Sequence, residues 1–87
     1  DYSIDELTRI FTYTCDRNDY TIEDEAIEKI HNLLEAKLKE QEDHFSNGRF
    51  IRNLFDDITM NQSKRLSKLT GDIAKETLML ITKDDVF

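Results

Sequence analysis

The chain contains no proline and only two glycines, Gly48 and Gly71. Proline and glycine are the residues that most often interrupt helices, because proline lacks an N–H donor and glycine has the greatest backbone freedom. Apolar residues instead recur at intervals of three and four over long segments of the 87 residues, which is the spacing of amphipathic helices. We therefore expect an all-α fold, a small bundle of three main helices joined by short connections.

Capping signals mark where these helices begin. Ser3 is followed one turn later by Glu6, a pattern in which each side chain bonds the other residue's backbone N–H. Asn47, or Ser46 before it, is a suitable N-cap for the third helix. The predicted elements are a helix from Ser3 to residues 17–19, an extended link over 20–22, a helix over 23–41, a loop over 42–46 and a helix over 48–68.

The last part of the chain predicts shorter elements. Asp72 is expected to cap a short helix over residues 73–77. Thr82 and Asp85 form a second capping-box pattern, which predicts a final helical turn. Two short apolar links can pair as a minimal two-strand contact, one at residues 20–22 and one at 80–81.

The apolar stripes define the expected core. Cys15 lies on the stripe of the first helix, so it reads as a buried structural thiol, and a single cysteine excludes an internal disulfide and fits a reducing compartment. The stripes are Ile4, Leu7, Ile10, Phe11 and Cys15; then Ala26, Ile27, Ile30, Leu33, Leu34 and Leu38; then Ile51, Leu54, Phe55, Ile58, Leu66 and Leu69.

Two arginines of the third helix are not explained by core packing alone. Arg49 points away from the apolar face on a helical wheel, and its planar guanidinium suits phosphate. Arg65 falls beside the apolar stripe, as does Gln62. Two interpretations of Arg65 are open: its stem covers the core while its head stays hydrated, or it is a buried polar tether to a neighbouring element.

Charge is distributed unevenly along the chain, whose net charge is −7. Residues 1–45 carry 13 acidic and 5 basic side chains, whereas residues 46–87 carry 7 basic and 6 acidic ones. This pattern fits either an ordinary solvated helix after an acidic half, or a locally basic helix that meets an anion. An acidic chain argues against general nucleic-acid binding, because neutralising phosphates dominates that affinity.

The sequence contains no recognisable catalytic or metal-binding motif. It has no Gly-x-x-x-x-Gly-Lys-Ser/Thr phosphate loop and no nucleophile–base signature. Asp16 opens a stretch that resembles a calcium loop, but Ile27 stands where a bidentate glutamate is needed. His31 and His44 are too far apart to form a local ligand pair. We therefore expect no bound metal. The sequence also has no long apolar run and no signal-peptide pattern, so we expect no membrane partner.

Several segments together resemble the C-terminal lid of AAA+ ATPases. The branch that they resemble most holds bacterial rubisco activase, stage V sporulation protein K and the ATPases of type VII secretion. The resemblance covers essentially the whole chain, and the block around Arg49 is its most specific part. It rests on residues 1–11, 20–22 and 47–55, on Gln62, and on residues 65–66 and 81–86.

This resemblance implies a site at the start of the third helix. The family motif is Gly-Asn-Ala-Arg, and its arginine, the sensor-2 residue, reaches the ATP phosphates. The matching residues here are Ser46, Asn47, Gly48 and Arg49. Arg49 would therefore bind ATP with Asn47 and Gly48 beside it. Ser46 and Gly48 depart from the motif, and a glycine in the first turn loosens a helix by up to about 1 kcal/mol relative to alanine.

The resemblance also implies partners. Residues 1–87 would be a single lid, a piece of a longer cytoplasmic, chaperone-like ATPase. A P-loop subdomain would bind ATP and Mg²⁺, the lid would close over the nucleotide, and neighbouring subunits would form a hexameric ring that remodels an unidentified protein. On its own the chain would not be an enzyme. The alternative from another functional class is a free-standing helical module that binds a protein partner.

Overall fold

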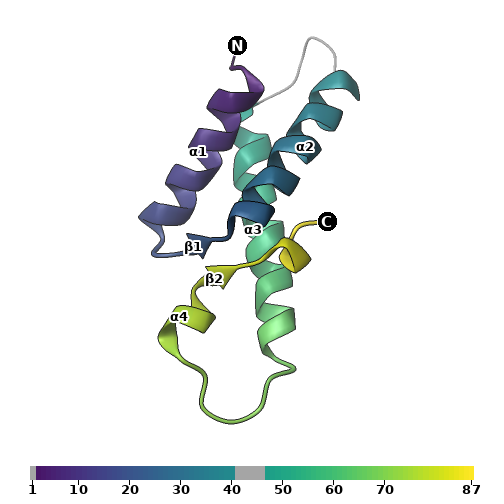
Figure 1. The fold of residues 1–87 in the computed structure, drawn as a ribbon. Helices are drawn as coiled ribbons and strands as arrows, with labels where there is room; N and C mark the ends of the chain where they lie inside the picture. The colour runs from purple at the N-terminus through teal and green to yellow at the C-terminus, as the bar shows by residue number, and fades with distance from the viewer. Residues whose placement is uncertain (1, 41–46) are drawn as a thin grey trace.

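In a computed structural model, which describes residues 2–40 and 47–87, three main helices lie against one another (Figure 1) and enclose one apolar core. The predicted loop over residues 42–46 lies outside the described residues. The main helices are α1 (Ile4–Arg17), α2 (Asp24–Glu40) and α3 (Asn47–Leu66); α4 (Lys75–Leu78) and the 3₁₀ turn η1 (Lys83–Asp85) are short. The predicted all-α bundle is confirmed, and its helix boundaries agree within one or two residues.

Helix α1 begins and ends as its sequence dictates. The Ser3 N–H donates to Glu6 Oε1 at 2.9 Å, and the Glu6 N–H donates to Ser3 Oγ at 3.1 Å, which confirms the capping box. At the other end, Asp19 has a φ of 66°, and the Tyr20 N–H returns to the Cys15 carbonyl at 2.9 Å. Aspartate tolerates this left-handed conformation better than most residues, so the chain turns sharply into the next element.

Two short strands confirm the predicted strand contact. β1 (Thr21–Ile22) pairs in parallel with β2 (Leu80–Ile81), with Thr21 opposite Leu80. The Thr21 N–H donates to the Met79 carbonyl at 2.8 Å. Figure 1 shows that this pair ties the α1–α2 connection to the C-terminal segment.

The core consists of side chains from all three main helices and from the C-terminal segment. Cys15 is 1% exposed, as the stripe of α1 predicted. Ile81 and Val86 complete the core from the C-terminal segment, in which β2 lies against α3, and η1 lies against both α2 and α3. Its buried hydrophobic residues are Leu7, Phe11, Cys15, Ala26, Ile30, Leu34, Ile51, Leu54, Ile58, Ile81 and Val86.

Two predictions about the region after α3 are wrong. Leu69, which the stripe of the third helix placed in the core, lies beyond the end of α3 at Leu66 and is 46% exposed. A tight turn, in which the Leu69 N–H donates to the Leu66 carbonyl, takes the chain away from the core. Asp72 does not cap the next helix either: α4 begins after Ala74, whose extended backbone has no side-chain cap.

Candidate functional site

The first turn of α3 carries the residues that the sequence singled out. Gly48 and Arg49 are exposed there. Ser46 and the side chain of Asn47 lie outside the described part of the structure, and so does the predicted cap. The first turn of α3 contains no acidic residue, whereas α1 opens with Asp5 and Glu6 and α2 opens with two acids of its own. The positive end of the α3 dipole therefore has no carboxylate on its own first turn.

Arg49 lies on the side of α3 opposite the core. Ile51, Leu54 and Ile58 are at most 3% exposed and face the other helices, so the outward position that the helical wheel predicts for Arg49 is confirmed. No hydrogen bond or ion pair to Arg49 occurs among residues 2–39 and 48–87. Within the described residues its guanidinium is therefore unpaired.

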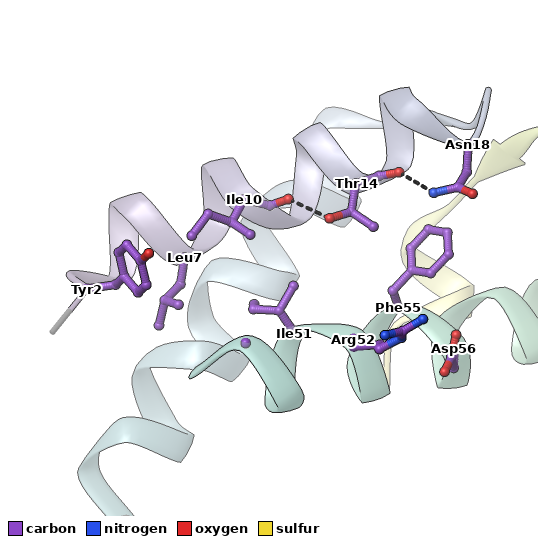
Figure 2. Close-up of a pocket in the computed structure, with 10 residues that line it drawn as sticks. Tyr2, Leu7, Ile10, Thr14, Asn18, Ile51, Arg52, Phe55 and Asp56 are labelled. Carbon is purple, nitrogen blue, oxygen red and sulfur yellow. Dashed lines mark hydrogen bonds between the residues drawn. The ribbon is translucent and has the colours of Figure 1, made fainter. Parts of the chain in front are cut away.

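A groove of about 530 Å³ lies between α1 and α3, beside this first turn. Tyr2 and Leu7 line one part of it, and Arg52 and Asp56 lie toward the other (Figure 2). Arg49 is not among the lining residues. The remaining lining residues are Ile10, Thr14, Asn18, Gly48, Ile51 and Phe55.

The walls of the groove are held by packing and by local hydrogen bonds. The ring of Phe55 stands edge-on to Phe11, with centroids 6.2 Å apart, and to Tyr20 at 5.8 Å. Such edge-to-face contacts fix the orientation of an aromatic ring. On the α1 side, the Asn18 amide donates to the Thr14 carbonyl at 2.8 Å. The groove therefore has a stable apolar wall and a polar margin.

Sequence reasoning missed this groove because it arises from the approach of two helices. Its signal in the sequence is weak: Ile10 and Phe55 are stripe residues that stay partly exposed. Arg52 was not singled out as a site residue, although its place one turn after Arg49 puts both on neighbouring parts of α3.

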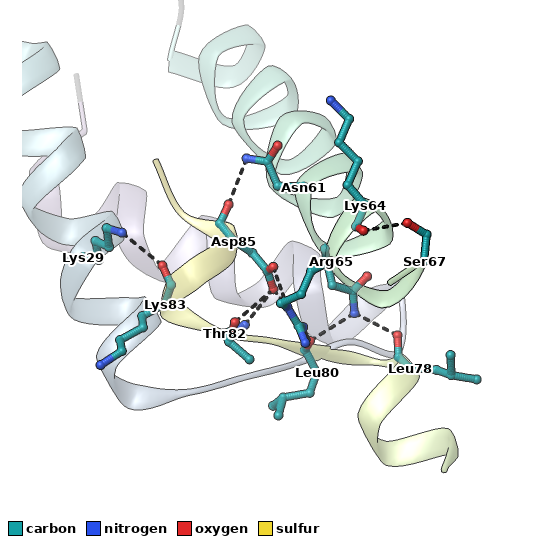
Figure 3. Close-up of polar contacts among 11 residues, drawn as sticks. Lys29, Asn61, Lys64, Arg65, Ser67, Leu78, Leu80, Thr82, Lys83 and Asp85 are labelled. Carbon is teal, nitrogen blue, oxygen red and sulfur yellow. Dashed lines mark hydrogen bonds and ion pairs between the residues drawn. The ribbon is translucent and has the colours of Figure 1, made fainter. Parts of the chain in front are cut away.

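The far end of α3 carries a buried polar network (Figure 3). Arg65 Nε donates to Asp85 Oδ1 at 2.8 Å, and its Nη2 donates to Asp85 Oδ2 at 3.1 Å. Gln62 Nε2 donates to the carbonyls of Leu78 and Leu80 at 2.8 and 3.0 Å. Of the two interpretations left open for Arg65, the tether to a neighbouring element is confirmed, although the arginine side chain itself stays 28% exposed.

Asp85 is the centre of this network and is only 1% exposed. Its Oδ2 also accepts the Thr82 N–H at 2.9 Å, which confirms the predicted pairing of these two residues at the last turn. Asn61 donates to the Asp85 backbone carbonyl at 3.1 Å. The hydrogen bond from Arg65 to Asp85 raises the pKa of the Arg65 guanidinium above its ordinary value. The C-terminal segment is thereby fixed to the helix that carries Arg49.

No group of three or more histidine, cysteine or acidic side chains is arranged to hold a metal ion within residues 2–40 and 47–87. Cys15 is buried, and burial raises the pKa of its thiol to about 12, so it is not a reactive thiolate near neutral pH. None of the helices in the described part of the chain combines the length and apolar character needed to cross a membrane.

Comparison with known proteins gives two findings. The family model described as the AAA lid domain matches residues 3–87. The chain is also 35% identical, over 88 aligned residues, to stage V sporulation protein K of Bacillus subtilis strain 168. That alignment covers 99% of this chain but only 27% of the relative, so the chain spans about a quarter of the relative's length.

Proposed function

The chain belongs to the AAA lid domain family of AAA+ ATPases, and on that premise we propose that it closes over ATP bound to a P-loop subdomain and supplies Arg49 to the phosphates. Asn47 and Gly48 form the turn that presents this arginine. The P-loop subdomain binds Mg²⁺, and neighbouring subunits form a hexameric ring in the cytoplasm that acts on an unidentified protein. Family membership favours this function over the free-standing interaction module.

The proposal rests on two observations about Arg49, its exposure and the absence of a partner for it among the described residues. It is an exposed cation on the first turn of a long helix, and no residue among 2–39 and 48–87 pairs with it. A guanidinium fits phosphate oxygens through two parallel N–H donors. Placed where negative charge develops during phosphoryl transfer, such a cation lowers the barrier to hydrolysis.

The chain contributes to hydrolysis without carrying it out. Its sequence contains no phosphate loop, and the chemistry of ATP cleavage needs that loop, Mg²⁺ and a positioned water molecule. The role of the lid is therefore to bring one cation to the nucleotide and to move as the nucleotide changes. We expect the 87-residue chain alone to hydrolyse no ATP, and measurable turnover by the pure chain would contradict this.

The fixed C-terminal segment supports a role in transmitting motion. Arg65 and Gln62 fasten β2 and η1 to α3, and β2 pairs with β1 directly before α2. Elements joined in this way move as one body. A shift of Arg49 on ATP hydrolysis would thus displace the whole lid, and with it any subunit that contacts it.

The decisive experiment compares Arg49→Ala with Lys64→Ala in the full-length ATPase. Both residues are exposed cations of α3, but only Arg49 lies on the first turn. We expect Arg49→Ala to lower kcat by about ten- to a thousandfold, on the scale of arginines that stabilise phosphoryl transfer, and Lys64→Ala to match the wild type. Normal ATP hydrolysis by Arg49→Ala would overturn the proposal.

A further inference from the structure

Met60 is an apolar side chain of α3 that remains 58% exposed. From residue 49 to residue 60 the helix makes three turns and about 20° more, so Met60 and Arg49 share one side of α3, about 16.5 Å apart along its axis. Ile51, Leu54 and Ile58 are at most 3% exposed and lie on the opposite side. Met60 is therefore no part of the core and projects from the side of α3 that carries Arg49.

The outward face of α3 has one apolar residue among polar ones. Its members fall within about 80° of one another on the helical wheel, at about 100° per residue, and each is exposed. A protein interface commonly has this composition, with an apolar centre and a polar, hydrated rim. Methionine suits a contact that forms and breaks repeatedly, because its flexible and polarizable side chain adapts to different neighbours. The outward face consists of Arg49, Asn53, Asp56, Met60 and Ser63.

The position of Arg49 indicates which partner covers this face. Arg49 reaches ATP phosphates only when the side of α3 that carries it turns toward the P-loop subdomain, and Met60 lies on that same side. The lid is also a small part of such a protein, because the alignment covers 27% of stage V sporulation protein K. Most of a protein of that kind lies outside the lid, so a subdomain large enough to cover the outward face is present in the same chain.

We propose that the outward face of α3 docks onto the P-loop subdomain of the same chain when ATP binds, with Met60 as its apolar anchor. The proposal rests on the proposed function of Arg49 and adds a second contact to the same closed state. Burial of Met60 favours the closed lid, so loss of this contact lowers the closed fraction and with it the apparent affinity for ATP. Met60 is a positioning residue, since it does not touch the nucleotide.

Methionine oxidation measures whether Met60 becomes covered. The full-length ATPase is treated with hydrogen peroxide, with and without a non-hydrolysable ATP analogue, and mass spectrometry gives the rate of sulfoxide formation. Met79, which is partly exposed in the C-terminal segment, is the reference within the same molecule. We expect the analogue to slow the oxidation of Met60 by about fivefold or more and to leave that of Met79 unchanged.

Two outcomes of this measurement would overturn the proposal. The first is an equal rate of Met60 oxidation with and without the analogue, which would mean that nothing covers the outward face in the closed state. The second is a protection of Met60 that disappears when the rings are diluted to single subunits. In that case a neighbouring subunit, rather than the P-loop subdomain of the same chain, would cover Met60.

Steady-state kinetics of the full-length ATPase give a second readout. For Met60→Ser we expect KM for ATP to rise about fivefold while kcat stays within about twofold, and Met60→Leu should match the wild type. Leu69→Ser is the control, because Leu69 is 46% exposed and lies just beyond the end of α3. An unchanged KM for Met60→Ser, or an equal rise for Leu69→Ser, would contradict the proposal.

The proposal and the proposed function can fail separately. Normal ATP hydrolysis by Arg49→Ala would refute the proposed function. If Arg49→Ala abolishes hydrolysis but Met60 oxidises equally fast with and without the analogue, Arg49 keeps its role and only the docking of the outward face is refuted.

Discussion

Arg65 and Asp85 form a two-point ion pair between α3 and the C-terminal segment, with Nε 2.8 Å from Oδ1 and Nη2 3.1 Å from Oδ2. The carboxylate is 1% exposed whereas the Arg65 side chain is 28% exposed, so removing Arg65 would leave a buried charge without its main partner. This pair determines how the last residues of the chain are attached to the bundle.

We expect Asp85→Ala to lower the free energy of unfolding by about 1–3 kcal/mol, because it leaves the Arg65 guanidinium and the Thr82 N–H without their acceptor. Urea unfolding of the 87-residue chain measures this. Asp84→Ala is the control, since Asp84 is the exposed neighbour and an ordinary surface change costs about 0.5 kcal/mol or less. If the two substitutions lowered the stability equally, Asp85 would not be the acceptor that attaches the C-terminal segment to α3.

Gln62 and Arg65 share one acceptor, because both donate to the Leu80 carbonyl. Their substitutions should therefore not be additive. In a double-mutant cycle of Gln62→Met and Arg65→Met we expect a coupling energy of about 0.5–3 kcal/mol. Arg17→Met combined with Gln62→Met should be additive, since Arg17 bonds Tyr13 and shares no partner with Gln62. Additivity in both cycles would mean that the network does not act as a unit.

We expect substitution by alanine to change the stability of the chain in opposite directions at the two glycines. A Cβ on Gly48 meets no atom within 4 Å and its φ is ordinary, whereas Gly71 has a φ of +82°. Gly48→Ala should stabilise the chain by about 0.5–1 kcal/mol through helix propensity. Gly71→Ala should destabilise it by about 1–2 kcal/mol, since side chains resist the left-handed region. Thermal unfolding measures both effects. If the two substitutions shifted the melting temperature in the same direction, the different backbone conformations assigned to Gly48 and Gly71 would be contradicted.

We expect the folded chain to lose stability at alkaline pH because of Cys15. Burial raises the pKa of its thiol from 9.0 to about 12, so the folded chain holds the thiol neutral after the unfolded chain has ionised it. The stabilisation is complete below about pH 9 and is lost as the pH rises toward 12, by at most about 1.4 kcal/mol per pH unit. The measurement is the free energy of unfolding at pH 8 and 10.5, compared with Cys15→Ala. Parallel pH profiles of the two chains would show that the thiol is not protected.

Arg49→Ala should leave the fold intact. Arg49 is exposed and unpaired within the described residues, so its removal should change the free energy of unfolding by about 0.5 kcal/mol or less. Leu54, one and a half turns along the same helix, is 3% exposed, and Leu54→Ala should cost about 2–5 kcal/mol. If Arg49→Ala unfolds the chain, any loss of ATPase activity reflects stability rather than phosphate binding.

The sequence predicted those features that depend on local patterns. The Ser3–Glu6 cap, the Thr82–Asp85 pairing and the three apolar stripes each involve residues within a few positions of one another. The contact between residues 20–22 and 80–81 was also predicted, because both links are short, apolar and placed between helical segments. The all-α fold followed from these elements.

Features that depend on distant residues could not be predicted in full. The sequence showed that Arg65 lies beside the core but not that Asp85 is its partner, because nothing local joins them. The groove required the relative placement of α1 and α3. The position of α4 depends on Gln62, which binds the Leu78 carbonyl at the end of that helix, so the local signal of Asp72 did not decide where it begins.

The parallel pairing of β1 with β2 has a consequence for biosynthesis. Thr21 and Leu80 lie near opposite ends of the chain, and Ile81 and Val86 fill the core from the C-terminal side. The ribosome synthesises the chain from the N-terminus, so α1 and α2 emerge before β2 does. At that stage the core is incomplete and β1 has no partner strand. The core is complete only after residues 80–86 have left the exit tunnel, and a nascent chain stalled before Leu80 would expose apolar surface to chaperones and proteases.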